Sequence, residues 1–517
     1  MTAEGQRDTP LGGGLWVVAS VVVPNLYVGV LSVAIDATLG AGGLGRQSVI
    51  AFAATAAITL AGSGGFIALV RSVASTHASH DRAGARHLVR WGARLHGVTG
   101  ASAAALVALP ALWDDDLRAA WLLAAVVTLL GTMQMVPAAV LIGCRRWREA
   151  NVVGLVTGAA AVPATILVLR AGGGVAGVFA VEAVMIAVNL TVAALLARRA
   201  LAGADDGARP RPEPPWRFAA LSAVGVTMTV VVWRRSELLV LAALASDEEV
   251  ARYSVAFGLS AILLALSERC STVMTSTFSG LAGDGAGPLR AAGARALRVL
   301  TVAMLPVTAW TAALGPAAIR VVYGDEYHRS GAVLLVMLTT MALLPLWTVS
   351  AAVLAARGDA TSPLLAGLGA CVLDLVVAVP LVAAHGALGA ALASVLGQLT
   401  TIGALWVVAR RRVGPIPVHV ASTLRAAGVA AGSGGVGWCV VVLMGGPIGL
   451  AAGVVATLSA AAVLAGVFRP LTWDDASWLS NALGARAKAR TAALLHRVAR
   501  HDPVVPGGQA PRPAASE

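Results

Sequence analysis

The sequence predicts an all-α polytopic membrane protein with about 14 transmembrane helices, arranged as two six-helix lobes related by a parallel repeat plus two extra helices. Three observations predict this fold class: the hydropathy of the chain, the alternation of charge between its loops, and an internal repeat. Of the 517 residues, 58% are hydrophobic and 12% are charged, and the mean hydropathy is +0.80. Many apolar runs reach about 20 residues, which is the length of a helix that crosses the hydrocarbon core.

These apolar runs give approximate boundaries for the helical spans. The expected spans cover residues 15–35, 48–70, 95–112, 118–142, 150–169, 174–197, 217–245, 250–280, 295–323, 331–356, 361–384, 386–409, 421–444 and 447–468. Proline and glycine occur inside several of them and are tolerated there, because neighbouring helices can satisfy the freed backbone groups.

Basic residues concentrate in alternate loops. With these boundaries, 29 of the 38 Lys and Arg residues fall in one set of loops, 6 fall in the opposite set and 3 lie inside spans. The opposite loops carry acidic clusters at Asp114–Asp116, Asp247–Glu249 and Asp325–Glu326. The positive-inside rule therefore predicts that both termini lie in the cytoplasm.

An internal repeat relates the two halves of the chain. The segment Gly174–Arg199 matches Gly386–Arg411 at an offset of 212 residues, and both segments end in an Arg-Arg pair. A shorter match relates Gly45–Phe52 to Ala251–Phe257. The first match pairs span 6 with span 12 and the second pairs span 2 with span 8, so spans 1–6 and 7–12 are expected to form lobes of equal topology.

The repeat sets the expected domain boundaries. Residues 1–203 form the N-terminal lobe with spans 1–6, and residues 217–412 form the C-terminal lobe with spans 7–12. Between them, the polar, Pro-rich residues 204–216 form a cytoplasmic linker. Residues 413–470 hold spans 13 and 14, and residues 471–517 form a basic cytoplasmic tail, in which 474–500 forms either an amphipathic helix or a disordered end. In transporters with such repeats the substrate path lies between the lobes.

Charged residues inside spans 7 and 8 are the strongest candidates for a functional site. Arg234, Arg235 and Glu237 interrupt an apolar run, and each charge at the centre of a span costs about 2.5–3.5 kcal/mol. Glu268 and Arg269 lie inside span 8. Charges at such depths normally face the interior of the helix bundle or an aqueous cavity.

Two interpretations of these charges remain open. In the first, Arg234, Arg235, Arg269 and Glu237 form a cationic substrate site between the lobes, because the planar fork of arginine binds pyrophosphate with parallel hydrogen bonds. In the second, they form structural ion pairs, with Arg234 and Glu237 at i and i+3 on one helix face. The excess of arginine over carboxylate favours the first interpretation and an anionic ligand.

Four further carboxylates are candidates for coupling transport to an ion: Glu268, Glu182, Asp374 and Asp36. Polar residues in spans more often form hydrogen bonds between helices, and the sequence does not separate the two roles. The histidines and cysteines lack metal-ligand spacing, and no nucleophile lies in a catalytic grouping. We therefore predict a transporter with no catalytic residues, metal or cofactor, and no nucleic-acid partner.

One glycine-rich segment, Gly40–Gly45, fits the pattern GxGxxG of dinucleotide-binding proteins. That motif requires a preceding strand and a following helix, and no strand is expected here. We instead expect a flexible turn between spans 1 and 2.

Three stretches of the chain resemble a known family: Trp233–Leu263, Ile319–Met337 and Ala355–Ser394. They are similar to the seventh and eighth spans, the Tyr-Gly-x-x-Tyr end of the ninth span, and spans 11 and 12 of the multidrug/oligosaccharidyl-lipid/polysaccharide flippase superfamily. Within it, the chain resembles the polysaccharide-export group, of O-antigen and teichoic-acid type. Asparagines common in the middle of span 11 are replaced here by Asp374 and its neighbours, so the resemblance assigns no site residue in that span.

The resemblance implies a flippase of the bacterial cytoplasmic (inner) membrane. Such a protein translocates undecaprenyl-pyrophosphate-linked oligosaccharide units for cell-surface polysaccharide biosynthesis, by alternating access and without ATP hydrolysis. Its expected partners are this lipid-linked glycan, membrane lipids, and a glycan polymerase or glycosyltransferase. Two alternatives remain: a cation-coupled multidrug antiporter, which is expected to have a carboxylate-dominated cavity, and a non-transporting scaffold, in which neutral replacement of the buried charges leaves function intact.

Overall fold

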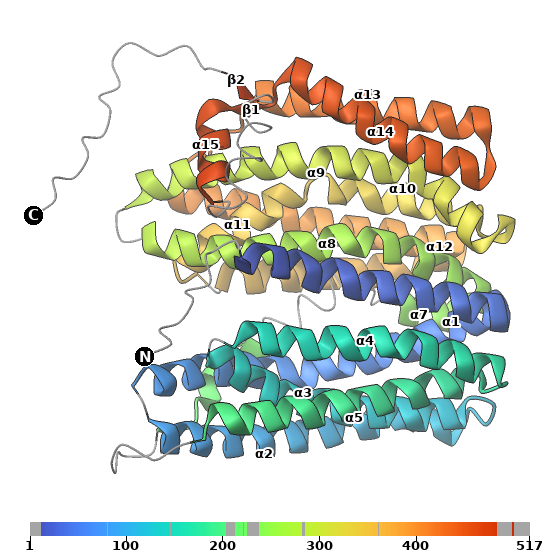
Figure 1. Ribbon diagram of the computed structural model, residues 1–517, viewed down its shortest axis with the longest axis vertical. Helices are drawn as coiled ribbons and strands as arrows, with labels where there is room; N and C mark the ends of the chain where they lie inside the picture. The colour runs from blue at the N-terminus through green and yellow to red at the C-terminus, as the bar shows by residue number, and fades with distance from the viewer. Residues whose placement is uncertain are drawn as a thin grey trace, which may run out of the picture.

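The computed structural model of the protein describes residues 12–79, 81–144, 146–202, 212–220, 222–224, 237–281, 285–359, 361–482 and 499–500. Almost all of these residues are helical, and the long helices run side by side in one bundle (Figure 1). The bundle divides into two groups of helices, which we call the N lobe and the C lobe.

The N lobe contains five α-helices. They are α1 (Gly12–Ala78), α2 (Arg82–Ala108), α3 (Arg118–Gly143), α4 (Trp147–Arg170) and α5 (Gly174–Ala200), with the short helix η1 (Leu109–Leu112) after α2. Helix α1 covers expected spans 1 and 2, which meet at a kink at Gly40, where φ is 71°. The expected turn between spans 1 and 2 is confined to Gly40: glycine permits the left-handed conformation at this one position, and a second helical segment begins directly after it.

The C lobe is larger. It contains α7 (Glu237–Leu244), α8 (Asp247–Leu281), α9 (Ala286–Tyr323), η3 (Asp325–Tyr327), α10 (Ser330–Met341), α11 (Leu344–Ala356) and α12 (Thr361–Val413). The extra helices α13 (Val420–Met444) and α14 (Gly446–Phe468) pack together against α9 at the edge of this lobe (Figure 1). Helix α12 contains a kink at Gly386, where φ is 54°.

The helices account for the expected membrane spans. Within the described residues, 10 helices are long and apolar enough to cross a membrane, and the bent pair of α10 and α11 raises the number to 11. Two of these helices, α1 and α12, each contain two expected spans joined at a kink. Span 7 is described only in part. The fold class of an all-α polytopic membrane protein is confirmed, and the number 14 is approximate.

Positions matched by the repeat share their local conformation. Gly174 and Gly386 begin the last helix of their lobes with φ of 58° and 54°. Ser48 and Ser254, matched by the shorter repeat, are each only 8% exposed. The sequence match at these positions thus corresponds to equal backbone geometry and equal burial.

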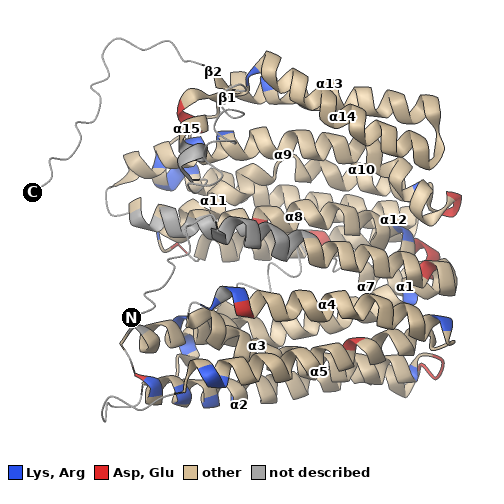
Figure 2. Ribbon diagram, viewed as in Figure 1, with Lys and Arg blue, Asp and Glu red and all other residues tan. Residues whose placement is uncertain are grey.

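The two ends of the bundle differ in charge. Lys and Arg concentrate at the end that carries the starts of α2 and α9, and most Asp and Glu lie at the opposite end (Figure 2). We call these ends the basic face and the acidic face. The acidic face carries Asp114–Asp116, Asp247–Glu249 and Asp325–Glu326.

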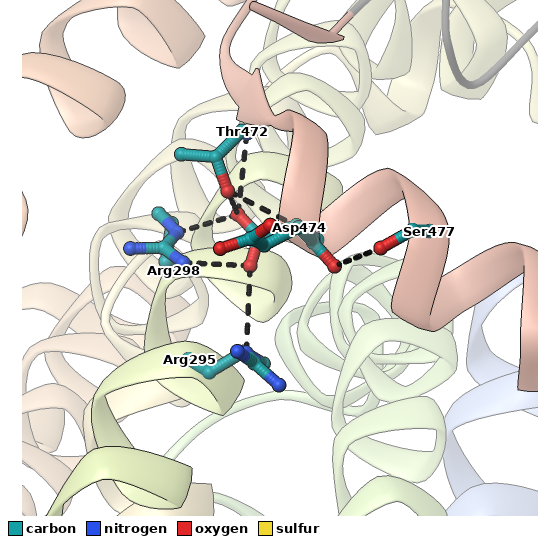
Figure 3. Close-up of polar contacts among 6 residues, drawn as sticks. Arg295, Arg298, Thr472, Asp474 and Ser477 are labelled. Atoms are coloured by element: carbon teal, nitrogen blue, oxygen red, sulfur yellow. Dashed lines mark hydrogen bonds and ion pairs between the residues drawn. The ribbon is translucent and has the colours of Figure 1, made fainter. Parts of the chain in front are cut away.

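At the basic face, the tail docks on α9. Strands β1 (Leu471–Thr472) and β2 (Ala499–Arg500) pair in parallel, and helix α15 (Trp473–Ala482) follows β1. Asp475 accepts two hydrogen bonds of 2.6 Å from Arg298, and Arg295 lies 3.9 Å away (Figure 3). The Thr472 hydroxyl donates to the same carboxylate at 2.8 Å. The backbone N–H groups of Thr472 and Asp475 each donate to the other residue's side chain at 3.3 Å, which forms a capping box. Of the helix expected over 474–500, α15 is the described part, and residues 483–498 lie outside the described residues.

We expect Asp475→Asn to release the tail. Asp475 is fully buried, and removing one partner of a buried ion pair costs about 3–5 kcal/mol. The undocked tail should then be populated about 150- to 5,000-fold more often, with faster hydrogen exchange across α15. Asp474→Asn is the matched control, because Asp474 is exposed. Equal exchange rates in both variants would contradict the docking role.

The same contact predicts a pH dependence. Burial raises the pKa of Asp475, but the hydrogen bonds from Arg298 and Thr472 outweigh burial and hold the pKa below its usual value. A lowered pKa in the docked state means that docking is favoured above the ordinary aspartate pKa of about 3.9 and is lost as the pH falls through the lower value.

Candidate functional site

Span 7 contacts the N lobe at its start and the C lobe at its end. The side chain of Phe218 lies under Arg71 of α1, 4.8 Å from the ring centre, and Trp216 packs edge-on against Trp91 of α2 at 5.2 Å. At the other end, Leu238 and Leu241 of α7 are fully buried in the core of the C lobe. The chain therefore passes from one lobe to the other between residues 224 and 237.

Two carboxylates are buried together inside the C lobe. Glu237, the first residue of α7, is 1% exposed, and Asp374 of α12 is also 1% exposed. The two side chains are close enough to interact electrostatically. Tyr253 of α8 donates a hydrogen bond of 3.1 Å to Oε2 of Glu237. Oε1 of Glu237 has no hydrogen-bond partner within the described part of the chain.

Neutral polar groups surround this carboxylate pair. The Ser394 hydroxyl of α12 lies near Glu237 and accepts from Nε2 of Gln398 at 3.2 Å. The Thr340 hydroxyl of α10 donates to Oε1 of Gln398 at 2.5 Å. Gly397 packs directly against Asp374, because a Cβ at this glycine would lie 3.2 Å from the aspartate Cβ. We call Glu237, Asp374, Tyr253, Ser394, Gln398 and Thr340 the carboxylate cluster.

A buried pair of carboxylates suits a site that binds and releases positive charge. Two negative charges in an apolar interior repel one another and lack solvent, so an added proton or cation is strongly favoured there. Hydroxyl and amide oxygens next to the pair add neutral lone pairs that can bind a cation. Among the described residues no group of three or more His, Cys, Asp or Glu side chains is arranged to hold a metal ion.

The lobes meet at the acidic face. Arg46 of α1 donates a hydrogen bond of 2.8 Å to Asp247 at the start of α8. Tyr327 donates to Asp36 of α1, and the Ser32 hydroxyl lies 2.6 Å from the Tyr323 hydroxyl of α9. Burial, followed by the hydrogen bond to Asp36, raises the pKa of Tyr327, so the phenol stays protonated as a donor.

The backbones also approach closely at this point. A Cβ at Gly45 of α1 would lie 2.0 Å from the carbonyl oxygen of Asp247. We call this contact, formed by Ser32, Asp36, Gly45 and Arg46 with Asp247, Tyr323 and Tyr327, the lobe contact. It closes the protein between α1 and the C lobe at the acidic face.

The structure brings together only some of the predicted site residues. Arg234 and Arg235 lie outside the described residues, as does the side chain of Arg269. Glu237 and Asp374 are neighbours in the carboxylate cluster, a pairing that the sequence did not predict. Asp36 belongs to the lobe contact and is 201 residues in sequence from Glu237 and 338 from Asp374.

The remaining two candidates lie elsewhere. Glu268 is half-buried on α8 and Glu182 is half-buried on α5. Sequence reasoning missed the partners Tyr253 and Tyr327. Both lie in motifs that carried the family resemblance, and a buried tyrosine usually hydrogen-bonds through its hydroxyl. These motifs could therefore have identified the two tyrosines as hydrogen-bond partners of buried polar groups.

A two-lobe helical bundle with lobes that touch at one membrane face and with buried intramembrane carboxylates defines a membrane transporter. Several solved structures share this fold. A multidrug-resistance transporter of the MATE family, in an inward-facing conformation, matches with a TM-score of 0.61 and 13% identity over 77% of this chain and 98% of that one. The lipid II flippase MurJ, in an inward closed conformation, matches with a TM-score of 0.55 and 10% identity over 83% of this chain and 98% of that one.

A transporter of the MOP superfamily from Pyrococcus furiosus, described as having a binding pocket of reverse polarity, matches with a TM-score of 0.55 and 15% identity over 77% of this chain and 94% of that one. A search of curated proteins finds no match. The model of the polysaccharide biosynthesis protein family matches residues 49–332, more than half of the chain, and that of the lipid II flippase MurJ matches residues 216–458. The chain belongs to the polysaccharide biosynthesis protein family, and the predicted superfamily is confirmed.

Proposed function

We propose that this protein translocates lipid-linked oligosaccharide units across the bacterial cytoplasmic membrane by alternating access, for polysaccharide synthesis at the cell surface. The observation that carries the proposal is the pair of family matches, to polysaccharide biosynthesis proteins and to a lipid II flippase, on one transporter fold. Undecaprenyl pyrophosphate is the proposed carrier, and a glycan polymerase or glycosyltransferase is the proposed partner.

The proposed orientation places the basic face in the cytoplasm, with both termini. The segregation of charge between the two faces supports it, because basic loops are retained in the cytoplasm. In this orientation the lobe contact closes the outer side, so a substrate path between the lobes is accessible from the cytoplasm, where lipid-linked units are assembled.

Arg234, Arg235 and Arg269 form the proposed pyrophosphate site, with Glu237 beside it. Support comes from the neighbouring segments: residues 216–224 pack on the N lobe and α7 packs in the C lobe, so Arg234 and Arg235 occur in the stretch of chain that connects the lobes. Arginine keeps its charge there at any physiological pH.

The carboxylate cluster is the proposed coupling site. Glu237 and Asp374 would take up a proton or a monovalent cation, and the resulting change of charge would alter how α7 packs against α12. Because α7 continues into the connecting stretch, this change reaches the proposed substrate site directly. Asp36, Glu182 and Glu268 remain weaker candidates for coupling.

The cation-coupled multidrug antiporter remains the second candidate, because MATE transporters share this fold. The arginine excess in spans 7 and 8 opposes it, since a cationic drug requires negative charge at its site. A non-transporting scaffold is the third candidate, and it predicts that neutral replacement of the buried charges has no effect.

Depletion of the protein in cells tests the proposal. Lipid-linked oligosaccharide should accumulate on the inner leaflet, and wild-type protein should reverse the accumulation. We expect Arg235→Ala to insert and accumulate normally but to fail in this rescue, because the pyrophosphate loses a charge-assisted hydrogen bond. Arg329→Ala, at an exposed arginine between η3 and α10, is the control and should rescue fully. Full rescue by Arg235→Ala would contradict the proposed site.

A further inference from the structure

A cavity of about 550 Å³ opens at the basic face of the N lobe, between α2 and the residues that lead into span 7. Its walls carry His87, Arg90 and Arg94 of α2, together with Trp91 and Trp216. The volume lies within the range of about 300–1,000 Å³ that is typical of small-molecule sites. This cavity is separate from the carboxylate cluster, which is enclosed by α7, α8, α10 and α12.

The geometry of helix α2 brings the basic side chains of the cavity together. His87, Arg90 and Arg94 recur at spacings of three and four residues, which puts them on one face of α2. Within the described residues, no carboxylate forms an ion pair with Arg90 or Arg94. Both guanidinium groups are exposed, so they are free to bind an anion from the surroundings.

Trp91, one of the residues that line the cavity, also carries a buried hydrogen-bond donor. Trp91 is 7% exposed, and its indole Nε1 finds no acceptor in the described part of the chain. Leaving a buried donor unsatisfied is unfavourable, and native proteins rarely do so. The edge-on contact with Trp216, at 5.2 Å between ring centres, fixes the indole in place. An acceptor oxygen bound in the cavity would satisfy this N–H.

The far end of the cavity is apolar. Leu95 and Val98 continue the same face of α2 toward the membrane interior, and Val98 is 68% exposed. Pro214 and Trp216 form the opposite wall. Arginine and tryptophan are typical of the membrane–water boundary, where headgroups lie, and leucine and valine are typical of the hydrocarbon region. The cavity can therefore bind an anionic group at one end and a hydrocarbon chain at the other.

We propose that this cavity binds the phosphate group of a membrane lipid, with Arg90 and Arg94 on the phosphate oxygens, the Trp91 N–H on a third acceptor, and the lipid chain along Leu95 and Val98. The ligand class is a phosphate-bearing lipid headgroup, either an anionic glycerophospholipid or a polyprenyl diphosphate. Binding here would hold the start of span 7 against the N lobe, because Trp216 lies at the start of span 7 and also forms a wall of the cavity. A glycerophospholipid at this site is independent of the proposed function, whereas a polyprenyl diphosphate would rest on it, because that group belongs to the proposed substrate.

The test uses the full-length protein in nanodiscs of phosphatidylcholine. Fluorescent phosphatidylglycerol, fluorescent polyprenyl diphosphate, and soluble inorganic phosphate are titrated in separate arms. We expect binding in at least one lipid arm and much weaker binding of inorganic phosphate, and the arm that binds identifies the source of the headgroup. Inorganic phosphate that binds as tightly as the lipids would overturn the assignment of a lipid.

Variants locate the site. Arg90→Gln with Arg94→Gln should weaken lipid binding about thirtyfold, from roughly fivefold per arginine at an anionic surface. The matched control, Arg82→Gln with Arg86→Gln, removes the same charge from exposed positions of α2 outside the cavity and should change binding by less than about threefold. Trp91→Phe keeps an aromatic ring but removes the donor and should weaken binding in the same arm. Equal losses in the double variant and its control would place binding elsewhere and refute the proposal.

Discussion

Gly45→Val is expected to stop transport by preventing closure of the acidic face. A Cβ at this position would lie 2.0 Å from the Asp247 carbonyl oxygen and 2.8 Å from its carbon, and both are backbone atoms at the start of α8. Relief therefore requires that the lobes separate. Overpacking of this kind costs about 1–3 kcal/mol, which lowers the population of the closed state by roughly 5- to 150-fold. Transport should fall at least about fivefold, because the cycle passes through this state.

Gly42→Val is the matched control. It lies three residues earlier on the same helix, and nothing lies within 4 Å of an added Cβ there. Transport by this variant should remain near the wild-type rate. The state of the acidic face is measured independently, as the rate at which a membrane-impermeant maleimide added from outside labels Ser32→Cys. Labelling should increase with Gly45→Val and not with Gly42→Val; a Gly45→Val protein that transports normally would show that the lobe contact is not part of the cycle.

Neutral replacement in the carboxylate cluster is expected to abolish ion-driven transport. Glu237→Gln keeps the size of the side chain and an oxygen that accepts from Tyr253, so the fold should persist while the charge is lost. Transport stimulated by an imposed proton or sodium gradient should fall by roughly a hundredfold, because the pair has lost one of its two negative charges and binds the coupling cation far more weakly. Asp374→Asn should have the same effect, and the double variant should be no worse than either single variant, since the two groups act as one unit.

Glu248→Gln is the control for this measurement, because Glu248 is an exposed carboxylate near the start of α8. Imposing the proton and sodium gradients separately identifies the coupling ion. Gradient-driven transport that survives in Glu237→Gln and in Asp374→Asn would exclude the cluster as the coupling site, and the buried pair would then have a structural role.

Hydropathy and charge were sufficient to predict the arrangement of helices, because a bilayer requires long apolar helices and retains basic loops on one side. The observed helices α3, α13 and α14 begin and end within a few residues of the expected spans. Where the two differ, the helices are longer: α2 begins at Arg82 and not at residue 95. Hydropathy detects only the apolar part of a helix, and the polar first turns of α2 continue beyond it.

The candidate site was predictable by residue but not by grouping. Glu237 and Asp374 were each singled out as charges inside spans, which any hydropathy profile reveals. Their pairing depends on how α7 packs against α12, and the chain positions differ by 137 residues. The lobe contact was missed for the same reason: Asp36 meets Tyr327 only after the lobes associate, and no local pattern encodes that association.

The central claim, that this protein moves a lipid-linked glycan across a membrane, is tested most directly with purified protein in proteoliposomes that contain fluorescent undecaprenyl-pyrophosphate oligosaccharide. A membrane-impermeant quencher is added outside, with and without an imposed membrane potential or ion gradient. The account predicts that wild-type protein carries inner-leaflet substrate to the quencher until little fluorescence remains, and that Gly45→Val does not. Quenching that stops at the outer-leaflet share in wild-type proteoliposomes, as in protein-free ones, under every imposed gradient would contradict it.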